Sequence, residues 1–367
     1  MKILIAPDSF KGTFSAKEIA MEMRHALPVA CQADARIQPL ADGGEGTAQV
    51  LAEALNATYR TVTVTGPLGE PVIASYAVAG ETALIEMAAA AGLPLVPEGQ
   101  LNPAWATTYG VGELVCHALE TGVAKIILGL GGSATVDGGA GALQALGAKL
   151  LGKNGQDISK GNLGLGELKK IDLSEAISKI KSTMLILATD VRNPLLGTNG
   201  AARIFGPQKG VRLHDIDSFE SRLEHYADLI EMATGKVIRG TPGTGAAGGL
   251  AFGLLAVGGR IVPGFALVSE AVGLEEKVRE ADLVITGEGK FDKTSLSGKV
   301  VGNVIGLCRK HHVRCWVVAG LSDFGEKDVQ PLGLEKIVTL FDAPEHNLHV
   351  LKEQTPLKLN ARFTTSF

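Results

Sequence analysis

Residues 282–299 read DLVITGEGKFDKTSLSGK, and this stretch indicates the class of fold. The largely apolar run at residues 283–286 predicts a short buried strand. Glycines, hydroxyl groups and charged side chains then crowd into one loop, and residues 300–311 predict a helix. A strand, a glycine-rich polar loop and a helix in this order are typical of a parallel sheet whose strand ends carry the function.

The same order of elements opens the chain. Residues 2–6 predict a strand, and Ser15 with Glu18 has the spacing of a capping box ahead of a helix. Asp42 and Glu45 have that spacing again, ahead of a helix expected to run to residue 55. Parallel strands are expected at residues 2–6, 35–40, 283–286, 315–319 and 336–341. Right-handed crossovers between them would give a flavodoxin-like, doubly wound sheet.

The segment between these two groups of strands has a different rhythm. Residues 58–65, 72–78 and 83–87 alternate as a meander, and a mixture of helices and apolar strands follows. We therefore expect an α/β protein in which a discontinuous, Rossmann-type flavodoxin-like domain, residues 1–56 and 280–367, is interrupted by a large mixed α/β inserted domain, residues 57–279. The sequence leaves the order of strands in the insert open.

Composition excludes several classes of protein. With 46% hydrophobic residues, the chain can bury a large core. Its formal net charge of -4 and its scattered Lys and Arg give no field for nucleic acid. The first apolar run is too short for a signal peptide, and no run approaches the ~20 apolar residues of a membrane helix. We expect a cytoplasmic protein with no nucleic-acid or membrane partner.

The four cysteines are dispersed, as in reduced intracellular proteins. One segment, CRKHHVRC at residues 308–315, places two histidines between two cysteines. It lacks the spacings that let ligands converge on a zinc ion, so a helix end followed by a strand is the better interpretation.

Two glycine-rich loops in the insert suit phosphate. Residues 129–141, GLGGSATVDGGAG, follow a predicted strand and precede a helix, where backbone N–H groups and the helix N-terminus attract anions. Ser133, Thr135 and Asp137 lie in this loop. Residues 243–248, GTGAAG, match G-x-G-x-x-G but follow no strand, so close helix packing and ligand approach both stay open. No Walker A sequence occurs.

Charged side chains gather at the predicted strand ends of the flavodoxin-like part. Ser9 and Lys11 follow the first strand, and Lys290, Asp292 and Lys299 follow the third. The carboxylates there need cations, either these lysines or Mg2+; they are Asp8, Asp42, Glu45, Glu288 and Asp292. Such a set suits phosphoryl transfer better than hydride transfer. Asp190 after a strand is typical of a turn or cap residue as well as of a catalyst, and Lys209 lies in a turn.

The motifs, taken in order, resemble those of the bacterial glycerate kinase family that acts on D-glycerate. They are APDSFKGTFSAKE, PLADGGEGT, TTYGVGEL, LGLGGSATVDGGAG, DVRNPLLG, FGPQKG, PGTGAAGGLAFG and TGEGKFDKTSLSGKV. The resemblance spans residues 1–341, and the tail after Ala343 matches less clearly. It implies an ATP-dependent, Mg2+-requiring kinase, with 2-phosphoglycerate the favoured product and 3-phosphoglycerate the alternative, and two α/β domains around a cleft.

The family motifs match this sequence at a set of candidate site residues, to which we assign roles. The predicted catalytic residues are Asp190 as general base, with Lys11 and Lys290 stabilising charge. The predicted substrate-binding residues are Ser9, Lys11, Asp292 and Lys299. The predicted nucleotide-binding residues are Gly131, Gly132, Ser133, Asp137, Lys209 and Gly245. Asp292 or Asp42 is the predicted metal ligand.

Two other functions stay open at this point. An NAD(P)-dependent oxidoreductase of a small hydroxy acid would use one of the G-x-G loops, and a non-catalytic sensor of sugar acids would keep the binding residues without turnover. The sequence leaves the phosphorylated hydroxyl, the range of acids and the assembly into a homo-oligomer undecided.

Overall fold

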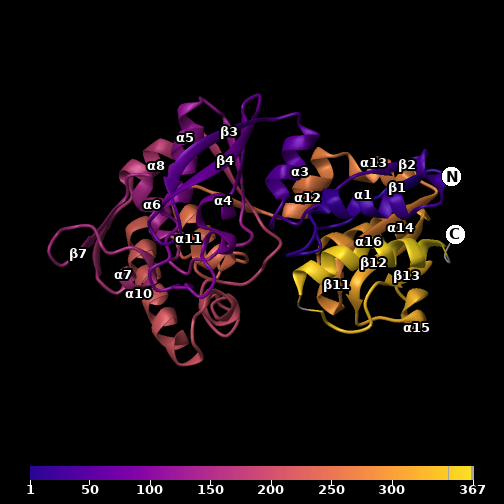
Figure 1. Ribbon diagram of the computed structural model, residues 1–367. Coiled ribbons are helices and arrows are strands. Elements are labelled where there is room, and N and C mark those ends of the chain that lie inside the picture. The colour runs from indigo at the N-terminus through magenta and orange to yellow at the C-terminus, as the bar shows by residue number, and fades with distance from the viewer. Residues whose placement is uncertain (346, 365–367) are drawn as a thin grey trace. The chain divides into compact units, whose positions relative to one another are not determined.

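The structure is a computed structural model that describes residues 1–345 and 347–364 (Figure 1). The chain divides into two compact units. Unit 1 comprises Met1–Asp42 and Gly264–Phe367, and unit 2 comprises Gly43–Pro263. Both contain helices and a sheet with parallel strands, as the α/β prediction requires.

Unit 1 is built on a five-stranded sheet in which every pairing is parallel. The strands run in the order β13-β12-β11-β1-β2. Their bounds are β1 Ile3–Ile5, β2 Ala35–Ile37, β11 Leu283–Phe291, β12 Arg314–Ser322 and β13 Lys336–Thr339. Because all five strands point the same way, their carboxyl ends meet at a single edge.

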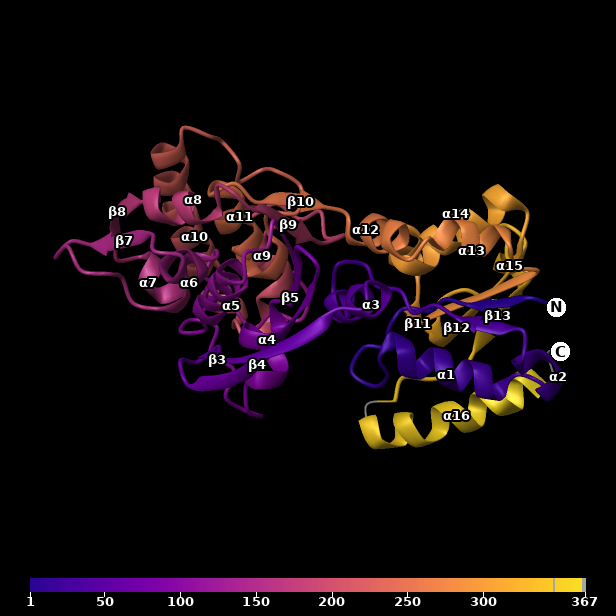
Figure 2. The ribbon, with the colours of Figure 1, turned by 90° about the horizontal axis from the view of Figure 1, so that it is seen from above.

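Helices cover both faces of this sheet. Figure 2 shows α1 (Ala16–Ala26) and α16 (Leu348–Thr364) on one face, and α13 (Leu274–Arg279) and α14 (Val300–His311) on the other. Unit 1 also holds α2 Val29–Gln32, α12 Gly264–Ala271, α15 Glu326–Val329 and the 3-10 helix η5 Lys293–Leu296. The predicted capping box at the start of α1 is present, since Ser15 and Glu18 exchange hydrogen bonds.

The stretch that opened the sequence analysis forms more strand than expected. β11 continues through Gly287, Glu288 and Gly289 to Phe291, where a loop was predicted. The strand extends because β12 pairs with it residue by residue as far as Ser322. Gly287 permits this pairing, since a Cβ there would lie 2.2 Å from the Val318 carbonyl oxygen.

The second predicted capping box was wrong. Helix α3 (Thr47–Ala54) begins after Gly46, which has a left-handed φ of 87°, and neither Asp42 nor Glu45 caps it. The capping acceptor lies instead on a strand, because the Ala48 N–H donates a hydrogen bond to Glu86 Oε1 at 2.7 Å. A helix N-terminus can take its cap from a distant strand, which the local spacing cannot reveal.

Unit 2 contains a mixed six-stranded sheet in the order β10-β9-β6-β5-β4-β3. The bounds are β3 Thr58–Thr65, β4 Pro71–Ala79, β5 Thr82–Glu86, β6 Lys125–Gly129, β9 Met184–Ala188 and β10 Arg260–Val262. Strands β3, β4 and β5 form the expected antiparallel meander, and the pairings from β5 to β10 are parallel. A separate antiparallel pair joins β7 (Lys149–Gly152) to β8 (Leu168–Asp172).

The helices of unit 2 enclose a large apolar core that includes Leu114, Leu128 and Leu143. Their bounds are α4 Ala88–Ala91, α5 Tyr109–Glu120, α6 Ala140–Ala145, α7 Gly161–Leu165, α8 Ser174–Ile180, α9 Ala201–Phe205, α10 Ile216–Thr234 and α11 Leu250–Ala256. Short 3-10 helices lie at η1 Leu93–Leu95, η2 Pro207–Lys209, η3 Leu213–Asp215 and η4 Ala246–Gly249.

The unit boundaries differ from the domain boundaries that the sequence predicted. Helix α3 belongs to unit 2, because it packs on β4, β5 and β6. Helices α12 and α13 belong to unit 1, where α13 packs on α14.

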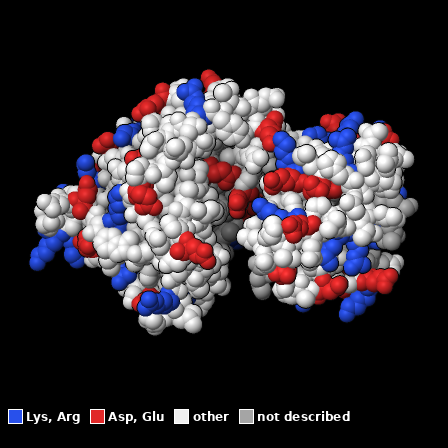
Figure 3. Space-filling view, in the orientation of Figure 1, with Lys and Arg blue, Asp and Glu red and all other residues white. Residues whose placement is uncertain are grey.

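The surface chemistry fits the charge count. Figure 3 shows Lys and Arg interspersed with Asp and Glu on each unit over the face in view. Within the described part of the chain, none of the helices has the length and apolar character needed to cross a membrane.

Candidate functional site

A pocket of about 350 Å³ lies at the carboxyl edge of the unit 1 sheet. Every strand of the sheet contributes to it through the residues at or after its end. The lining side chains and backbone come from Asp8, Ser9, Phe10, Lys11, Thr13, Asp42, Glu288, Gly289, Lys290, Asp292, Lys299, Gly320, Leu321, Phe341, Ala343, Glu345, Leu351 and Thr355. This volume is in the range of small-molecule sites, and the position is the one that open parallel sheets use for ligands.

Asp8 forms part of the floor of this pocket. Its backbone N–H donates to the Gly287 carbonyl at 2.9 Å, which continues the pairing of β1 with β11 beyond the strand end. The side chain is 5% exposed, and its Oδ1 accepts a hydrogen bond from the Ser9 N–H at 2.7 Å. Burial and, to a lesser extent, the charge of Asp42 together raise the pKa of Asp8 to about 7, although the Ser9 hydrogen bond and the charge of Lys11 oppose the shift. Near neutral pH, Asp8 can therefore release or accept a proton.

Glu288 is the second buried acid of the pocket, and it is 8% exposed. Burial raises its pKa, although a hydrogen bond with the Ser295 side chain and the charge of Lys299 oppose the shift. Its Oε1 has no hydrogen-bond partner among the residues that the structure describes.

Asp292 and the lysines form the wall of the pocket. Asp292 caps η5, because its Oδ1 accepts hydrogen bonds from Thr294 N at 2.8 Å and Thr294 Oγ1 at 2.6 Å. The Thr294 hydroxyl holds the pKa of Asp292 below its usual value. Lys299 Nζ donates to Thr294 Oγ1 at 2.9 Å, and Lys290 Nζ lies 3.9 Å from Asp292 Oδ2. The wall thus places two ammonium groups beside a fixed carboxylate.

The strand ends of unit 2 form a second candidate site, which begins with the glycine-rich loop after β6. The Leu130 N–H donates to the Gly43 carbonyl at 3.0 Å. At Gly131 a Cβ would lie 2.3 Å from the Glu45 backbone nitrogen, so only glycine fits. Residues 43–46 and 129–132 therefore pack backbone against backbone, with their peptide groups brought close together.

Ser133 and Lys209 meet beneath this loop. Lys209 is 2% exposed, and its Nζ donates to Ser133 Oγ at 2.6 Å and to the Thr135 carbonyl at 2.7 Å. Burial lowers the pKa of Lys209 to about 7, against the opposing charge of Asp137. The turn FGPQKG, whose role the sequence did not indicate, therefore supplies the lysine that is hydrogen-bonded to the glycine-rich loop.

Asp137 is enclosed and links the loop to two helices. Its carboxylate accepts hydrogen bonds from Thr108 N and Thr108 Oγ1, both at 2.8 Å, and from Gly139 N at 3.1 Å and Gly141 N at 3.3 Å. Burial nevertheless raises its pKa. Because Asp137 and Lys209 are both enclosed, any part they play in nucleotide binding acts through the backbone that they hold.

The surroundings of Gly245 and Gly248 show whether close packing explains the glycines of PGTGAAGG. The Gly245 N–H donates to the Asn193 carbonyl at 2.9 Å, and a Cβ on Gly245 would lie 2.3 Å from the Pro194 carbonyl oxygen. Gly248 has a φ of 65°, and a Cβ there would lie 1.9 Å from the Thr135 carbonyl oxygen. Close packing accounts for both glycines, while ligand approach stays a prediction.

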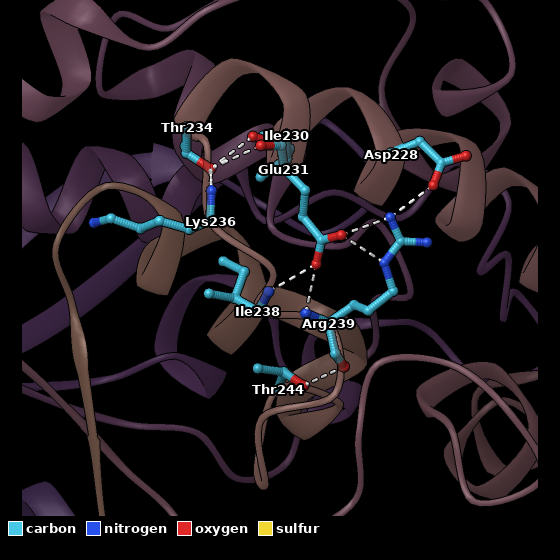
Figure 4. Close-up of polar contacts among 8 residues, drawn as sticks. All are labelled: Asp228, Ile230, Glu231, Thr234, Lys236, Ile238, Arg239 and Thr244. Carbon is cyan, nitrogen blue, oxygen red and sulfur yellow. Dashed lines mark hydrogen bonds and ion pairs between the residues drawn. The ribbon is translucent and has the colours of Figure 1, made fainter.

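A salt-bridged clip fixes the approach to this motif (Figure 4). Glu231 at the end of α10 accepts hydrogen bonds from Ile238 N at 2.7 Å and from Arg239 N and Nε at 2.8 Å. The Arg239 guanidinium also pairs with Asp228 at 2.6 Å. The Arg239 carbonyl in turn accepts from Thr244 Oγ1 at 3.0 Å, so the clip positions the first residues of the glycine-rich turn.

The structure distributes the predicted site residues over the two units. The unit 1 pocket brings together Ser9, Lys11, Asp42, Lys290, Asp292 and Lys299. Unit 2 contains Gly131, Gly132, Ser133, Asp137, Asp190, Lys209 and Gly245. Asp190 follows β9 at the same sheet edge as the β6 loop and is partly exposed. The roles assigned to these residues stay predictions.

Three acidic residues had been assigned no role in the predicted site, although Asp8 and Glu288 were among the carboxylates expected to need cations. Asp8 and Glu288 line the unit 1 pocket, and Glu86 ends β5 at the edge that carries the β6 loop. Burial raises the pKa of Glu86 to about 7, and its Oε2 has no partner among the described residues. Asp8 directly precedes the selected Ser9, so its position was the available signal. Glu288 was expected in the loop after a strand and lies within β11 instead, whereas Glu86 belongs to no predicted motif and gave no signal.

No zinc or other multidentate metal site emerges from the described residues, where no group of three or more His, Cys, Asp and Glu side chains is placed to hold an ion. In the segment CRKHHVRC, Cys308 and Cys315 are buried free thiols. His311 instead lies 2.8 Å from Glu275.

Lysines and hydroxyl groups in a strand-end pocket, together with glycine-rich loops at the strand ends of a second, mixed sheet, are typical of α/β enzymes that act on small anionic substrates. The chain belongs to the glycerate kinase family, whose family model matches residues 3–363. This membership makes the protein an enzyme that phosphorylates glycerate.

Relatives of known name cover nearly the whole chain. It is 45% identical to glycerate 2-kinase of Escherichia coli strain K12, over 87% of this chain and 85% of that protein. It is 44% identical to glycerate kinase of Bacillus subtilis strain 168, over 94% of each chain. A crystal structure of a glycerate kinase 2 candidate from Salmonella typhimurium LT2 matches with a TM-score of 0.81 and 39% identity, over 100% of this chain and 98% of that one.

Proposed function

We propose that this enzyme transfers the γ-phosphoryl group of ATP to a hydroxyl of D-glycerate, with 2-phosphoglycerate as the favoured product and 3-phosphoglycerate as the alternative. The observation that carries the choice of a small acid is the unit 1 pocket, which combines about 350 Å³ with Lys11, Lys290 and Lys299. The name glycerate 2-kinase of the Escherichia coli relative supports the position of transfer.

The acid would bind in the unit 1 pocket. Its carboxylate is a single small anion, and Lys11 and Lys299 offer ammonium groups from two different strand ends. The Ser9 hydroxyl adds a neutral donor at the same edge. Lys290 and Asp292 complete the proposed set of polar groups in this pocket.

The nucleotide phosphates would bind to the glycine-rich loops of unit 2. Gly131 and Gly132 leave the backbone after β6 without side-chain cover, and Ser133 is held by Lys209. Asp190 stays the predicted general base, because it follows the end of β9. Catalysis in this reaction class comes mainly from positioning and electrostatic stabilisation, for which buried supports such as Asp137 are suited.

Mg2+ is expected to accompany the nucleotide. It usually takes one or two protein carboxylates and completes its shell with phosphate oxygens and water. Asp42 fits this sparse requirement, because it lines the pocket and is near enough to Asp8 to raise that residue's pKa. Asp292 fits less well, since its Oδ1 already accepts hydrogen bonds from Thr294 and Ser295. When bound, the ion would neutralise phosphate charge.

The finer description of the fold belongs to the same proposal. The strand order of unit 1, with the first two strands of the chain exchanged relative to sequence order, supports a flavodoxin-like sheet. We propose that the two units are domains, with unit 2 inserted into unit 1. The cytoplasmic location stays a prediction from the sequence.

The decisive experiment is incubation with Mg-ATP and D-glycerate, followed by phosphorus and carbon NMR of the product. A phosphorylated C2 hydroxyl is the expected result, and phosphorylation at C3 would select the alternative product. Binding of glycerate without ADP formation would support the sugar-acid sensor. Quenching of NADH fluorescence without ATP binding would support the oxidoreductase and would contradict the kinase proposal.

A further inference from the structure

Glu288 is a buried acid whose hydrogen bonding is incomplete. Among the residues that the structure describes, its Oε1 has no partner, although the side chain is only 8% exposed. Buried polar atoms in folded proteins nearly always have a partner, because leaving one unpaired costs free energy. An unpaired carboxyl oxygen in the lining of a pocket is therefore a place where a ligand can supply the missing donor.

The backbone of Glu288 is held on both sides, so the carboxyl group cannot move far from the pocket. Glu288 pairs with Ala319 of β12, and the preceding Gly287 carbonyl accepts from Asp8 N at 2.9 Å. The Ser295 side chain bonds the carboxyl group as well. Rotation about the terminal torsion of a glutamate is soft, so Oε1 can turn toward a ligand while the side chain stays in place.

The charges around Glu288 indicate which ligand group it accepts. Asp8 and Asp292 raise the negative charge of the region, whereas Lys11 and Lys299 line the same pocket and suit the carboxylate of the acid. A second anion beside Glu288 would be repelled, but a neutral hydroxyl can donate a hydrogen bond to it.

We propose that Glu288 is a specificity-determining residue that accepts a hydrogen bond from the non-reacting hydroxyl of the bound acid. The proposal rests on the proposed function, which places D-glycerate in this pocket. The non-reacting hydroxyl is chosen because the Glu288 carboxyl is nearly enclosed, whereas the reacting hydroxyl must stay open to a phosphoryl donor. The enzyme would accordingly select acids that carry two hydroxyl groups over acids that carry one.

The test compares Glu288→Gln and Glu288→Ala with the wild-type enzyme on D-glycerate and on the analogue that lacks the non-reacting hydroxyl. That analogue is D-lactate when transfer occurs at C2 and 3-hydroxypropanoate when it occurs at C3. A site built to bond a hydroxyl can reject the analogue by roughly 10^4 in kcat/KM. We expect Glu288→Ala to raise KM for glycerate at least tenfold and to reduce the discrimination at least tenfold by leaving analogue turnover little changed. Glu288→Gln keeps an acceptor oxygen and should lose less on glycerate.

Glu326→Gln is the matched control, because Glu326 is exposed, belongs to unit 1 outside the lining of this pocket and makes the same change of charge. It should leave the discrimination unchanged. Circular dichroism and calorimetric binding of D-glycerate without nucleotide separate a folding defect from lost recognition.

Three outcomes would overturn the inference. One is an equal loss in Glu288→Ala with glycerate and the analogue. Another is a roughly hundredfold or greater loss of turnover rate with KM unchanged, which would make Glu288 a proton acceptor. The third is unchanged binding and selectivity. Absence of turnover and binding in the wild type would instead remove the proposed function itself.

Discussion

The pH dependence of stability should change when Asp8 is replaced by asparagine. Asparagine keeps the shape of the side chain and keeps an oxygen to accept the 2.7 Å hydrogen bond from the Ser9 N–H. It removes the carboxylate that burial and the charge of Asp42 disfavour. Asp8 lines the unit 1 pocket. The substitution Asp8→Asn should therefore stabilise unit 1 above neutral pH.

The magnitude follows from the shift in pKa, from 3.8 to about 7. Between these values the folded chain retains a proton that the unfolded chain has released, so the stability of the wild type falls as pH rises through this window. At 1.36 kcal/mol for each pH unit, the loss reaches an upper limit of about 4 kcal/mol above pH 7. The variant has no such loss. Its advantage should be near zero at pH 4 and greatest at pH 8.

Urea unfolding at pH 4, 5, 6, 7 and 8 measures this difference. Trp316 reports on unit 1, because it is 3% exposed in that core, whereas Trp105 in unit 2 is 49% exposed. Asp42→Asn provides a second check, since it removes the neighbouring charge and should recover part of the same stability at pH 8. A difference between Asp8→Asn and wild type that is constant with pH, or a variant less stable at pH 8, would refute the reasoning.

Two substitutions in unit 2 test the packing around its glycine-rich loops, both by urea unfolding. Gly248→Ala should destabilise by at least about 2 kcal/mol, because its φ of 65° is left-handed and its Cβ would meet the Thr135 carbonyl; Gly235→Ala, at a φ of 66° with open space around it, should cost only about 1 kcal/mol. Equal costs at the two glycines would contradict the packing argument. Arg239→Ala should cost about 1 to 3 kcal/mol, because it removes the guanidinium that pairs with Glu231, whose side chain is 10% exposed. The exposed pair of Arg36 and Glu280 is the control, and Arg36→Ala should cost under about 1 kcal/mol; a similar loss at both arginines would argue against a positioning clip.

Hydrophobic period and capping signals were enough for most of the elements. The helix predicted at residues 300–311 matches α14, and the meander of unit 2 matches β3, β4 and β5. The sequence predicted these elements because their hydrophobic patterns are regular over long segments. The sequence could not predict the full length of β11. The second half of this strand has the composition of a glycine-rich loop and forms a strand because it pairs with β12.

The candidate site shows the same division. Ser9, Lys11 and Lys299 were found because charged and hydroxyl residues follow strands in the sequence. Glu86 was missed, because an acid inside a strand gives no local signal. Glu288 was named only as one carboxylate among several, because its burial depends on neighbours far along the chain. Whether Asp137 and Lys209 face solvent or the interior was equally beyond reach, since the groups that enclose them come from separate elements.

The pairing of β1 with both β2 and β11 has a consequence for synthesis of the protein. β1 and β2 leave the ribosome early, but the neighbour that completes their sheet begins only at Leu283. At about 5 to 20 residues per second, the two strands wait roughly 12 to 50 s, while all of unit 2 emerges as one continuous segment. During this interval the apolar side of β1 is without its partner. A chaperone that binds extended apolar segments should therefore contact the nascent chain at β1 and leave once β11 has been made.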